Sequence, residues 1–213
     1  MPPNQQPRHT AQGAGRGAGA LLQFKITLTG IRPPIWRRVL VPEGLSLSGL
    51  HDVIQEVMGW TDSHLHDFHW RGERFGLPDP EFDEERVVDE RTVTLKELGL
   101  SIKDRLEYVY DFGDGWEHVL TVEQVLEAGE HQTPVCLKGA RSCPPEDCGG
   151  IWGYANLLEI LKDPTHEEYE EWKTWLPENF DPEQCDLAEV NSALSVRQWT
   201  IAPPSRKGRR KKM

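Results

Sequence analysis

The sequence has no run of about 18 apolar residues, the minimum for a membrane-spanning helix. Residues 1–20 contain Pro, Gln, Gly and Ala without an apolar central segment, so they do not resemble a secretory signal. We expect them to form a disordered leader. Cysteine is also scarce and shows no regular disulfide spacing; the four are Cys136, Cys143, Cys148 and Cys185. These absences favour a cytoplasmic protein whose cysteines are free thiols or metal ligands.

Basic residues are few and unevenly placed. The chain has 24 Lys and Arg against 35 Asp and Glu, a net charge of −11. Without the six basic residues near the C-terminus, 18 Lys and Arg remain, so residues 1–205 carry −17. Such a body repels phosphate backbones, and no GxGxxG, GKS or GKT nucleotide loop occurs. The negative charge of residues 1–205 therefore favours binding of metal ions or basic partners over binding of nucleic acid.

Residues 201–213 are expected to form a flexible basic tail. A polycation of this kind could bind nucleic acid, an acidic surface or the chain's own acidic body. The tail's candidate binding residues are Arg206, Lys207, Arg209, Arg210, Lys211 and Lys212.

The first part of the ordered region reads as a strand pair followed by a helix. Apolar and polar residues alternate from Leu22, and a second strand is expected at Ile35–Val41. Ser46 or Ser48 can cap the following helix, and Gly59 can end it in the left-handed conformation.

The middle of the chain predicts further strands. Gly72–Arg91 is acidic and contains proline, so we expect a long excursion there with one short strand at residues 86–88. Gly113-Asp114-Gly115 supplies the positive φ angles of a hairpin turn. The other expected strands are His64–Arg71, Leu106–Phe112, Trp116–Val122 and Pro134–Lys138.

Helices dominate the last third. One is expected from Gly149-Gly150 through Leu161. The pairs Thr165 with Glu168 and Asp186 with Glu189 have the spacing of capping boxes. Strands first and helices last predict a single compact α+β domain over residues 21–200, with an antiparallel-rich sheet. Its N-terminal strand pair and helix would be followed by a C-terminal group of helices.

The chain has eight tryptophans. Two of them, Trp172 and Trp175, share a helix with several glutamates, and we expect the indoles to form its buried stripe. Five more are expected in the core: Trp36, Trp60, Trp70, Trp116 and Trp152.

Two groups of side chains could carry chemistry. Asp111, Asp114 and His118 could act as general acid and base, although aspartates beside a turn usually bind backbone amides. His118 also alternates with apolar residues, which is typical of a core histidine.

The second group is a candidate zinc site. His64 and His66 would project from one face of a strand and could join cysteine thiolates around one ion. The cysteine spacing lacks the two-residue knuckle of a strong zinc motif, so buried structural cysteines are the alternative. The candidate ligands are His64, His66, Cys143, Cys148 and Asp147.

Motifs along almost the whole ordered region resemble the plasmid pRiA4b ORF-3-like family, whose members are sometimes labelled TnpR. The matching segments are Pro33–Val39, Leu50–Trp60, His64–Phe68, Tyr110–His118, Cys143–Gly150, Gly153-Tyr154, Asp163–Tyr169 and Phe180–Leu187. The resemblance implies a compact α+β domain and a passenger role in mobile elements, with no established activity. The chain lacks the nucleophilic serine and arginine cluster of serine resolvases. Cys185 stands where the family more often has an aromatic residue.

The sequence supports three hypotheses about function, and the leading one is not catalytic. The leading hypothesis is a soluble binding or accessory protein with an unidentified protein or peptide partner. A zinc-dependent hydrolase using His64 and His66 with Cys143 or Cys148 is the second. A nucleic-acid-associated protein acting through the basic tail is the third.

Overall fold

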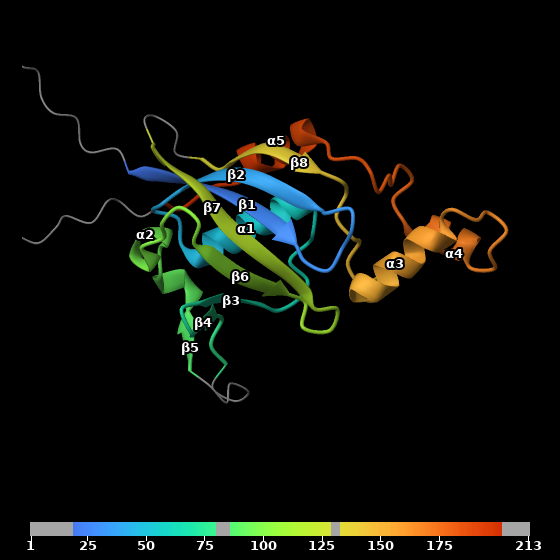
Figure 1. Cartoon of the computed structure of the whole chain (residues 1–213), viewed down its shortest axis with the longest axis horizontal. Coiled ribbons are helices and arrows are strands. Elements are labelled where there is room, and N and C mark those ends of the chain that lie inside the picture. The colour runs from blue at the N-terminus through green and yellow to red at the C-terminus, as the bar shows by residue number, and fades with distance from the viewer. Residues whose placement is uncertain (1–18, 80–85, 129–132, 202–213) are drawn as a thin grey trace, which may run out of the picture.

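One sheet of eight strands organises the chain, in the order β5-β4-β3-β6-β7-β1-β2-β8 (Figure 1). The computed structural model describes residues 19–79, 86–128 and 133–201. The strands are β1 Ala20–Leu28, β2 Trp36–Pro42, β3 His66–Trp70, β4 Glu73–Gly76, β5 Val87–Asp89, β6 Arg105–Tyr110, β7 Trp116–Glu127 and β8 Val135–Ala140. The helices are α1 Leu47–Met58, α2 Leu95–Leu98, α3 Gly150–Ile160, α4 Tyr169–Trp175 and α5 Leu187–Val196, with a 3₁₀ turn η1 at Glu90–Thr92. The α+β prediction is confirmed.

Strand β1 lies inside the sheet, between β2 and β7, and is antiparallel to both. Its alternation places Phe24, Ile26 and Leu28 in the core, each at most 1% exposed. A register shift between Gln23 and Phe24 interrupts the pairing with β7. The predicted N-terminal strand pair is therefore confirmed.

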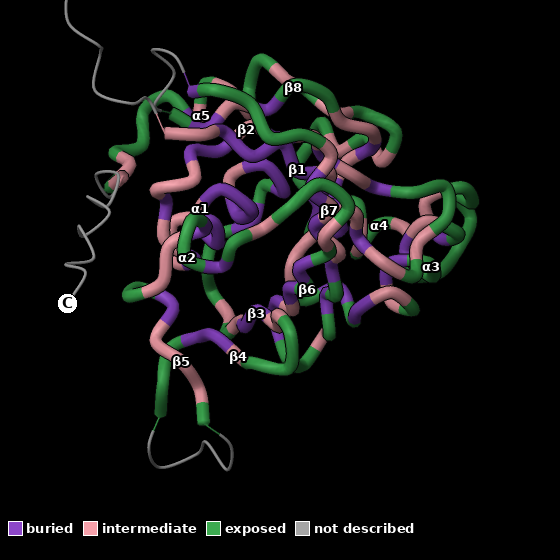
Figure 2. Tube along the Cα trace, turned by 60° about the vertical axis from the view of Figure 1, so that its left-hand side comes forward, coloured by how far each residue is buried: buried purple, intermediate pink, exposed green. Residues whose placement is uncertain are grey.

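Helix α1 covers one face of the sheet and is largely buried (Figures 1 and 2). Ser46 caps it by accepting a hydrogen bond from the Gly49 amide, and Gly59 ends it with a φ of 80°. Both expected boundaries are confirmed. The start of a helix needs a side-chain acceptor for its free amides, which Ser46 provides, and its end often needs a left-handed residue, which is Gly59.

The excursion at residues 72–91 contains more structure than its sequence indicates. β4 pairs with β3, and β5 runs parallel to β4. The expected strand at 86–88 is β5, which begins one residue later. Residues 80–85 lie outside the described part.

Helix α2, which follows the excursion, was not predicted, although Thr94 and Glu97 form its reciprocal capping box.

The two predicted capping boxes differ in outcome. Asp186 caps α5 by accepting from the amides of Ala188 and Glu189, which is the side-chain half of the predicted box. The prediction for Thr165 is wrong: its amide and hydroxyl both donate to Asp163. Helix α4 begins only at Tyr169, and Glu168 provides no side-chain cap.

Helices α3 and α4 extend away from the sheet (Figure 1). Trp152 on α3 is 82% exposed, and α4 contains no buried residue. The prediction that Trp152 belongs to the core is therefore wrong. The predicted buried stripe is wrong for Trp175, which is 47% exposed, whereas Trp172 is half-buried and packs against the core. The sheet covers these helices too little to bury Trp152 and Trp175. Trp60 and Trp116 are in the core as expected, whereas Trp36 and Trp70 are half-buried.

Residues next to both expected limits of the domain, 21 and 200, take part in backbone pairing. β1 includes Ala20, and Ile201 forms an isolated bridge with Leu45. Residues 1–18 of the expected leader and residues 202–213 of the expected tail lie outside the described part. Within the described ranges, no helix is long and apolar enough to cross a membrane.

Candidate functional site

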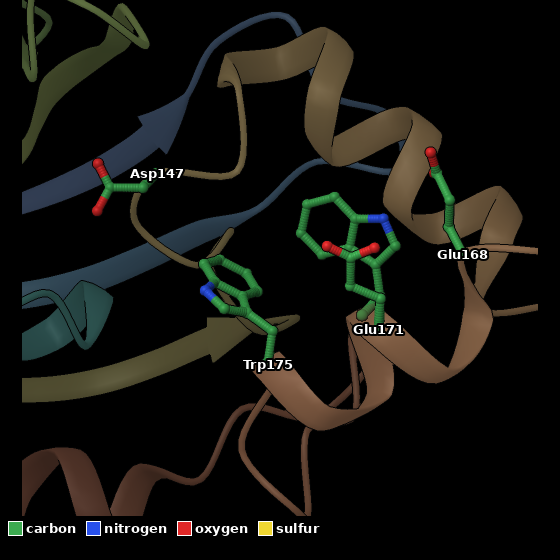
Figure 3. Close-up of a pocket in the computed structure, with 5 residues that line it drawn as sticks. Asp147, Glu168, Glu171 and Trp175 are labelled. Atoms are coloured by element: carbon green, nitrogen blue, oxygen red, sulfur yellow. The ribbon is translucent and has the colours of Figure 1, made fainter.

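A pocket of about 310 Å³ opens beside α4. Figure 3 shows the residues around it: two indole rings and Glu171 from α4, Glu168 just before that helix, and Asp147 from the loop before α3, whose carboxylate points away from Trp175. The lining residues are Asp147, Glu168, Glu171, Trp172 and Trp175. Helical spacing places Glu171 and Trp172 beside Trp175, because residues three or four apart lie on one face of a helix.

The two indoles meet almost at right angles. Their ring centroids lie 5.2 Å apart with 84° between the planes. Trp175 remains 47% exposed, and Trp172 is half-buried. The pocket therefore has two aromatic faces turned in different directions, both close to glutamates.

Several other aromatic rings of the protein already carry a cation, although in the described ranges Trp152, which is 82% exposed, carries none. Lys25 and Arg38 both lie over Trp36. Other such contacts join Arg71 to Trp70, Arg74 to Phe112 and Arg197 to Trp199. Within the described ranges, no Lys or Arg lies over Trp172 or Trp175 in this way. The pocket thus offers an acidic, aromatic surface that the chain's own described cations leave unused.

A larger depression, of about 540 Å³, lies between the end of α1, residues 142–145 and α5. Arg37 and Cys143 line it, and Arg37 is only 3% exposed. The guanidinium donates to the carbonyls of Trp36, Val57 and Ala140, and its Nη2 lies 3.4 Å from Cys143 Sγ. Backbone carbonyls thus satisfy most of its donors, which indicates a role in holding β2, α1 and β8 together.

The three catalytic candidates do not form one site. Asp111 Oδ1 accepts from the amides of Gly113 and Asp114, as aspartates at turns usually do. Asp114 Oδ2 accepts from the Gly149 amide at 3.2 Å. His118 is buried farther along β7, where its ring packs against Trp60 and Tyr108. Burial lowers the pKa of His118 to about 4, so the ring is neutral at pH 7.

The metal candidates separate into different places, which corrects the expected ligand set. His64 precedes β3 and lies near Asp111 and Asp147, whereas His66 stacks on His51. The described residues contain two groups with metal-ligand geometry, and neither includes a cysteine. The prediction assumed that His64 and His66 share one face of a strand. Strand β3 begins only at His66, so His64 lies outside the strand and its side chain is not on that face.

Cys143 and Cys148 are buried thiols. Burial raises the pKa of Cys143 to about 11 and that of Cys148 to about 12. Cys143 Sγ lies 3.0 Å from Met58 Sδ. These surroundings match the alternative reading of the cysteines as small hydrophobic core residues.

Sequence reasoning missed a buried polar network on α1. Gln55 Nε2 donates to the Tyr108 hydroxyl, which bonds to His51 Nδ1 at 2.8 Å. His51 Nε2 then lies 2.8 Å from Asp62 Oδ1, and the Asp62 amide donates to Gln55 Oε1. The available signal was His51 and Gln55 standing four residues apart on the mostly apolar face of α1.

The family model for plasmid pRiA4b ORF-3-like proteins matches residues 20–189. The chain belongs to this family. The match covers all eight strands of the described sheet and reaches into α5.

Two proteins similar to this chain carry no assigned activity in their names. An uncharacterised protein, y4hQ, from Sinorhizobium fredii (strain NBRC 101917 / NGR234) is 37% identical over 195 residues, covering 90% of this chain and 98% of its own. The crystal structure of MM3350, a protein of unknown function from Methanosarcina mazei Go1, is 38% identical with a TM-score of 0.73. That alignment covers 80% of this chain and 97% of MM3350. The fold thus belongs to a family of uncharacterised proteins.

The basic tail was the third candidate. All six of its basic residues, from Arg206 to Lys212, lie outside the described part of the chain. Association with nucleic acid through this tail stays a prediction from the sequence.

Proposed function

We propose that the protein is a binding protein that recognises a basic peptide segment of a partner through the α4 pocket. The observation that carries this proposal is the pair of orthogonal indoles, Trp172 and Trp175, beside Glu168 and Glu171. A Lys or Arg side chain is attracted both to an indole face and to a carboxylate. The net charge of −17 over residues 1–205 favours the same class of partner.

The magnitudes indicate a partner with several cations. One exposed cation–π contact contributes about 0.5–1 kcal/mol, and an exposed ion pair contributes up to about 1 kcal/mol. A millimolar complex already requires about 4 kcal/mol. A single basic side chain in the pocket is therefore too weak, and neighbouring cations must contact other carboxylates.

We place this binding in the cytoplasm, as an accessory role alongside a mobile genetic element. In support, the family takes its description from a plasmid reading frame, and all four cysteines are free thiols. Free thiols are typical of a reducing compartment.

The test is an NMR titration of the eight tryptophan indole N–H signals in the full chain. The probe is a synthetic peptide with the sequence of residues 205–213, SRKGRRKKM. We expect the signals of Trp172 and Trp175 to shift most, and the shifts to diminish as salt is added. The matched negative control is the same peptide with Glu in place of every Lys and Arg, which should cause no such shifts.

Variants separate the pocket from general charge attraction. Trp175→Ala should weaken peptide binding severalfold, whereas Trp152→Ala, a change at an exposed indole outside the pocket, should not. Equal shifts at all exposed indoles, or equal binding by both variants, would refute the proposal.

A further inference from the structure

Three side chains from separate parts of the chain converge beside the β6–β7 turn. His64 precedes β3, Asp111 opens the turn, and Asp147 lies in the loop before α3. His64 Nε2 is 3.3 Å from Asp147 Oδ1 and 3.7 Å from Asp111 Oδ2. One potential ligand atom from each residue lies within 4.8 Å of the other two.

Neighbouring hydrogen bonds hold the Asp111 carboxylate, and the loop that carries Asp147, in place independently of His64. The Asp111 side chain is 10% exposed, and its Oδ1 accepts from the amides of Gly113 and Asp114. Oδ2 is thereby directed towards His64. The loop that contains Asp147 is fixed to the same turn, because Asp114 Oδ2 accepts from the Gly149 amide.

His64 Nε2 is the unusual atom of the group. It is buried, and among the described residues it has no hydrogen-bond partner, although two carboxylate oxygens lie within 3.7 Å. Buried polar atoms are normally hydrogen-bonded. Asp147 Oδ1 is near enough to His64 Nε2 for a hydrogen bond but lies in an unsuitable direction, and Asp111 Oδ2 is too far away. A cation held between the three side chains would satisfy this nitrogen.

The spacing matches a tetrahedral metal ion. Zn²⁺ binds imidazole nitrogen and carboxylate oxygen at about 2.0–2.2 Å, which separates tetrahedral ligand atoms by about 3.3–3.6 Å. The observed separations from His64 Nε2 are 3.3 and 3.7 Å. We propose that His64, Asp111 and Asp147 bind Zn²⁺, with a fourth position open on the side of Asp147, whose side chain is 71% exposed.

The other group with metal-ligand geometry is already satisfied. His51 is bonded at both ring nitrogens, to Tyr108 and Asp62, and His66 Nε2 lies 3.0 Å from Glu90 Oε2. A metal there would have to break these contacts. The unpaired nitrogen of His64 therefore distinguishes its group from the group around His51.

This zinc site is separate from the proposed peptide pocket, although Asp147 borders both. Figure 3 shows the Asp147 carboxylate pointing away from Trp175. Loss of zinc binding and loss of peptide binding can therefore be distinguished by variants at different residues.

The experiment is zinc titration of the metal-free full chain in competition with a chromophoric chelator. We expect one equivalent of Zn²⁺, and at least a tenfold loss of affinity in His64→Gln and in Asp147→Asn. Glu146→Gln is the matched control, because it changes a neighbouring carboxylate that bonds to Tyr110 outside the group. Far-UV circular dichroism confirms that each variant is folded.

Cobalt substitution tests the ligand types. Co²⁺ bound by His64, Asp111 and Asp147 should give a tetrahedral visible spectrum without the near-ultraviolet thiolate charge-transfer band. A thiolate band, zinc affinity unchanged in His64→Gln and Asp147→Asn, or no saturable zinc binding would each overturn the proposal. Loss of zinc in His66→Gln alone would assign the metal to the group around His51 instead.

Discussion

His51 and His66 lie face to face, with their ring centroids 3.4 Å apart and 4° between the planes. Each ring also contacts a carboxylate, Asp62 for His51 and Glu90 for His66. Two imidazolium ions at this distance would repel strongly in a buried site. The stack can therefore hold at most one of the two rings as an imidazolium ion without disruption.

The first prediction concerns acid stability. Burial, followed by the charge of His66, lowers the pKa of His51 from 6.5 to about 4. The unfolded chain then binds the proton more tightly than the folded chain, so the stability from neutral His51 is complete above pH 6.5 and is lost as pH falls towards 4. The contribution is on the order of 3 kcal/mol. Urea unfolding between pH 4.5 and 7.5 measures it, and a flat free energy of unfolding over that range would contradict it.

The second prediction isolates His118, whose pKa burial also lowers to about 4. His118→Phe should fill the same aromatic surroundings, by Trp60 and Tyr108, without an ionisable group. We expect this variant to lose less stability than the wild type between pH 6.5 and 4.5, by about 1–3 kcal/mol. His166→Phe, at an exposed position, is the control and should leave the slope unchanged.

The third prediction compares two glycines with similar backbone angles. Gly99 has a φ of 63° and open space where a Cβ would lie, whereas Gly150 has a φ of 66° and a Cβ position 2.4 Å from the Asp114 carbonyl oxygen. Gly99→Ala should cost about 1–2 kcal/mol from left-handed strain alone. Gly150→Ala should cost clearly more, about 3–4 kcal/mol, because the turn must also move. Thermal or urea unfolding measures the loss of stability in each variant. Equal losses in the two variants would contradict the predicted clash at Gly150.

The fourth prediction concerns the thiols. Burial raises the pKa of Cys136 and Cys143 to about 11 and that of Cys148 to about 12, so almost none is thiolate at pH 8. Cys185 is only half-buried. A thiol reagent at pH 8 should label one cysteine in the folded chain and four after unfolding. Cys185→Ser should abolish the labelling of the folded chain, and fast labelling of that variant would show that another thiol is accessible.

The sequence predicted the elements whose determinants are local. Alternation defined the strands around Phe24, and Ser46 and Gly59 defined the ends of α1. The hairpin around Asp114 also follows from its turn residues. In each case the deciding interactions lie within a few residues along the chain, so the pattern was sufficient.

The candidate sites depended on contacts between distant segments. Helical spacing placed Trp172 and Trp175 on one face, but the sequence could not indicate that the sheet leaves this face uncovered. His64 and His66 are two residues apart and belong to different groups, because β3 begins between them.

The sequence by itself determined the family, the fold class and the acidic body of this protein. Only the tertiary structure decided which residues share a site. His64 meets Asp147 across 83 positions because hydrogen bonds dock the loop before α3 on the β6–β7 turn. Local propensity acts over neighbouring residues, whereas a site is assembled by long-range packing.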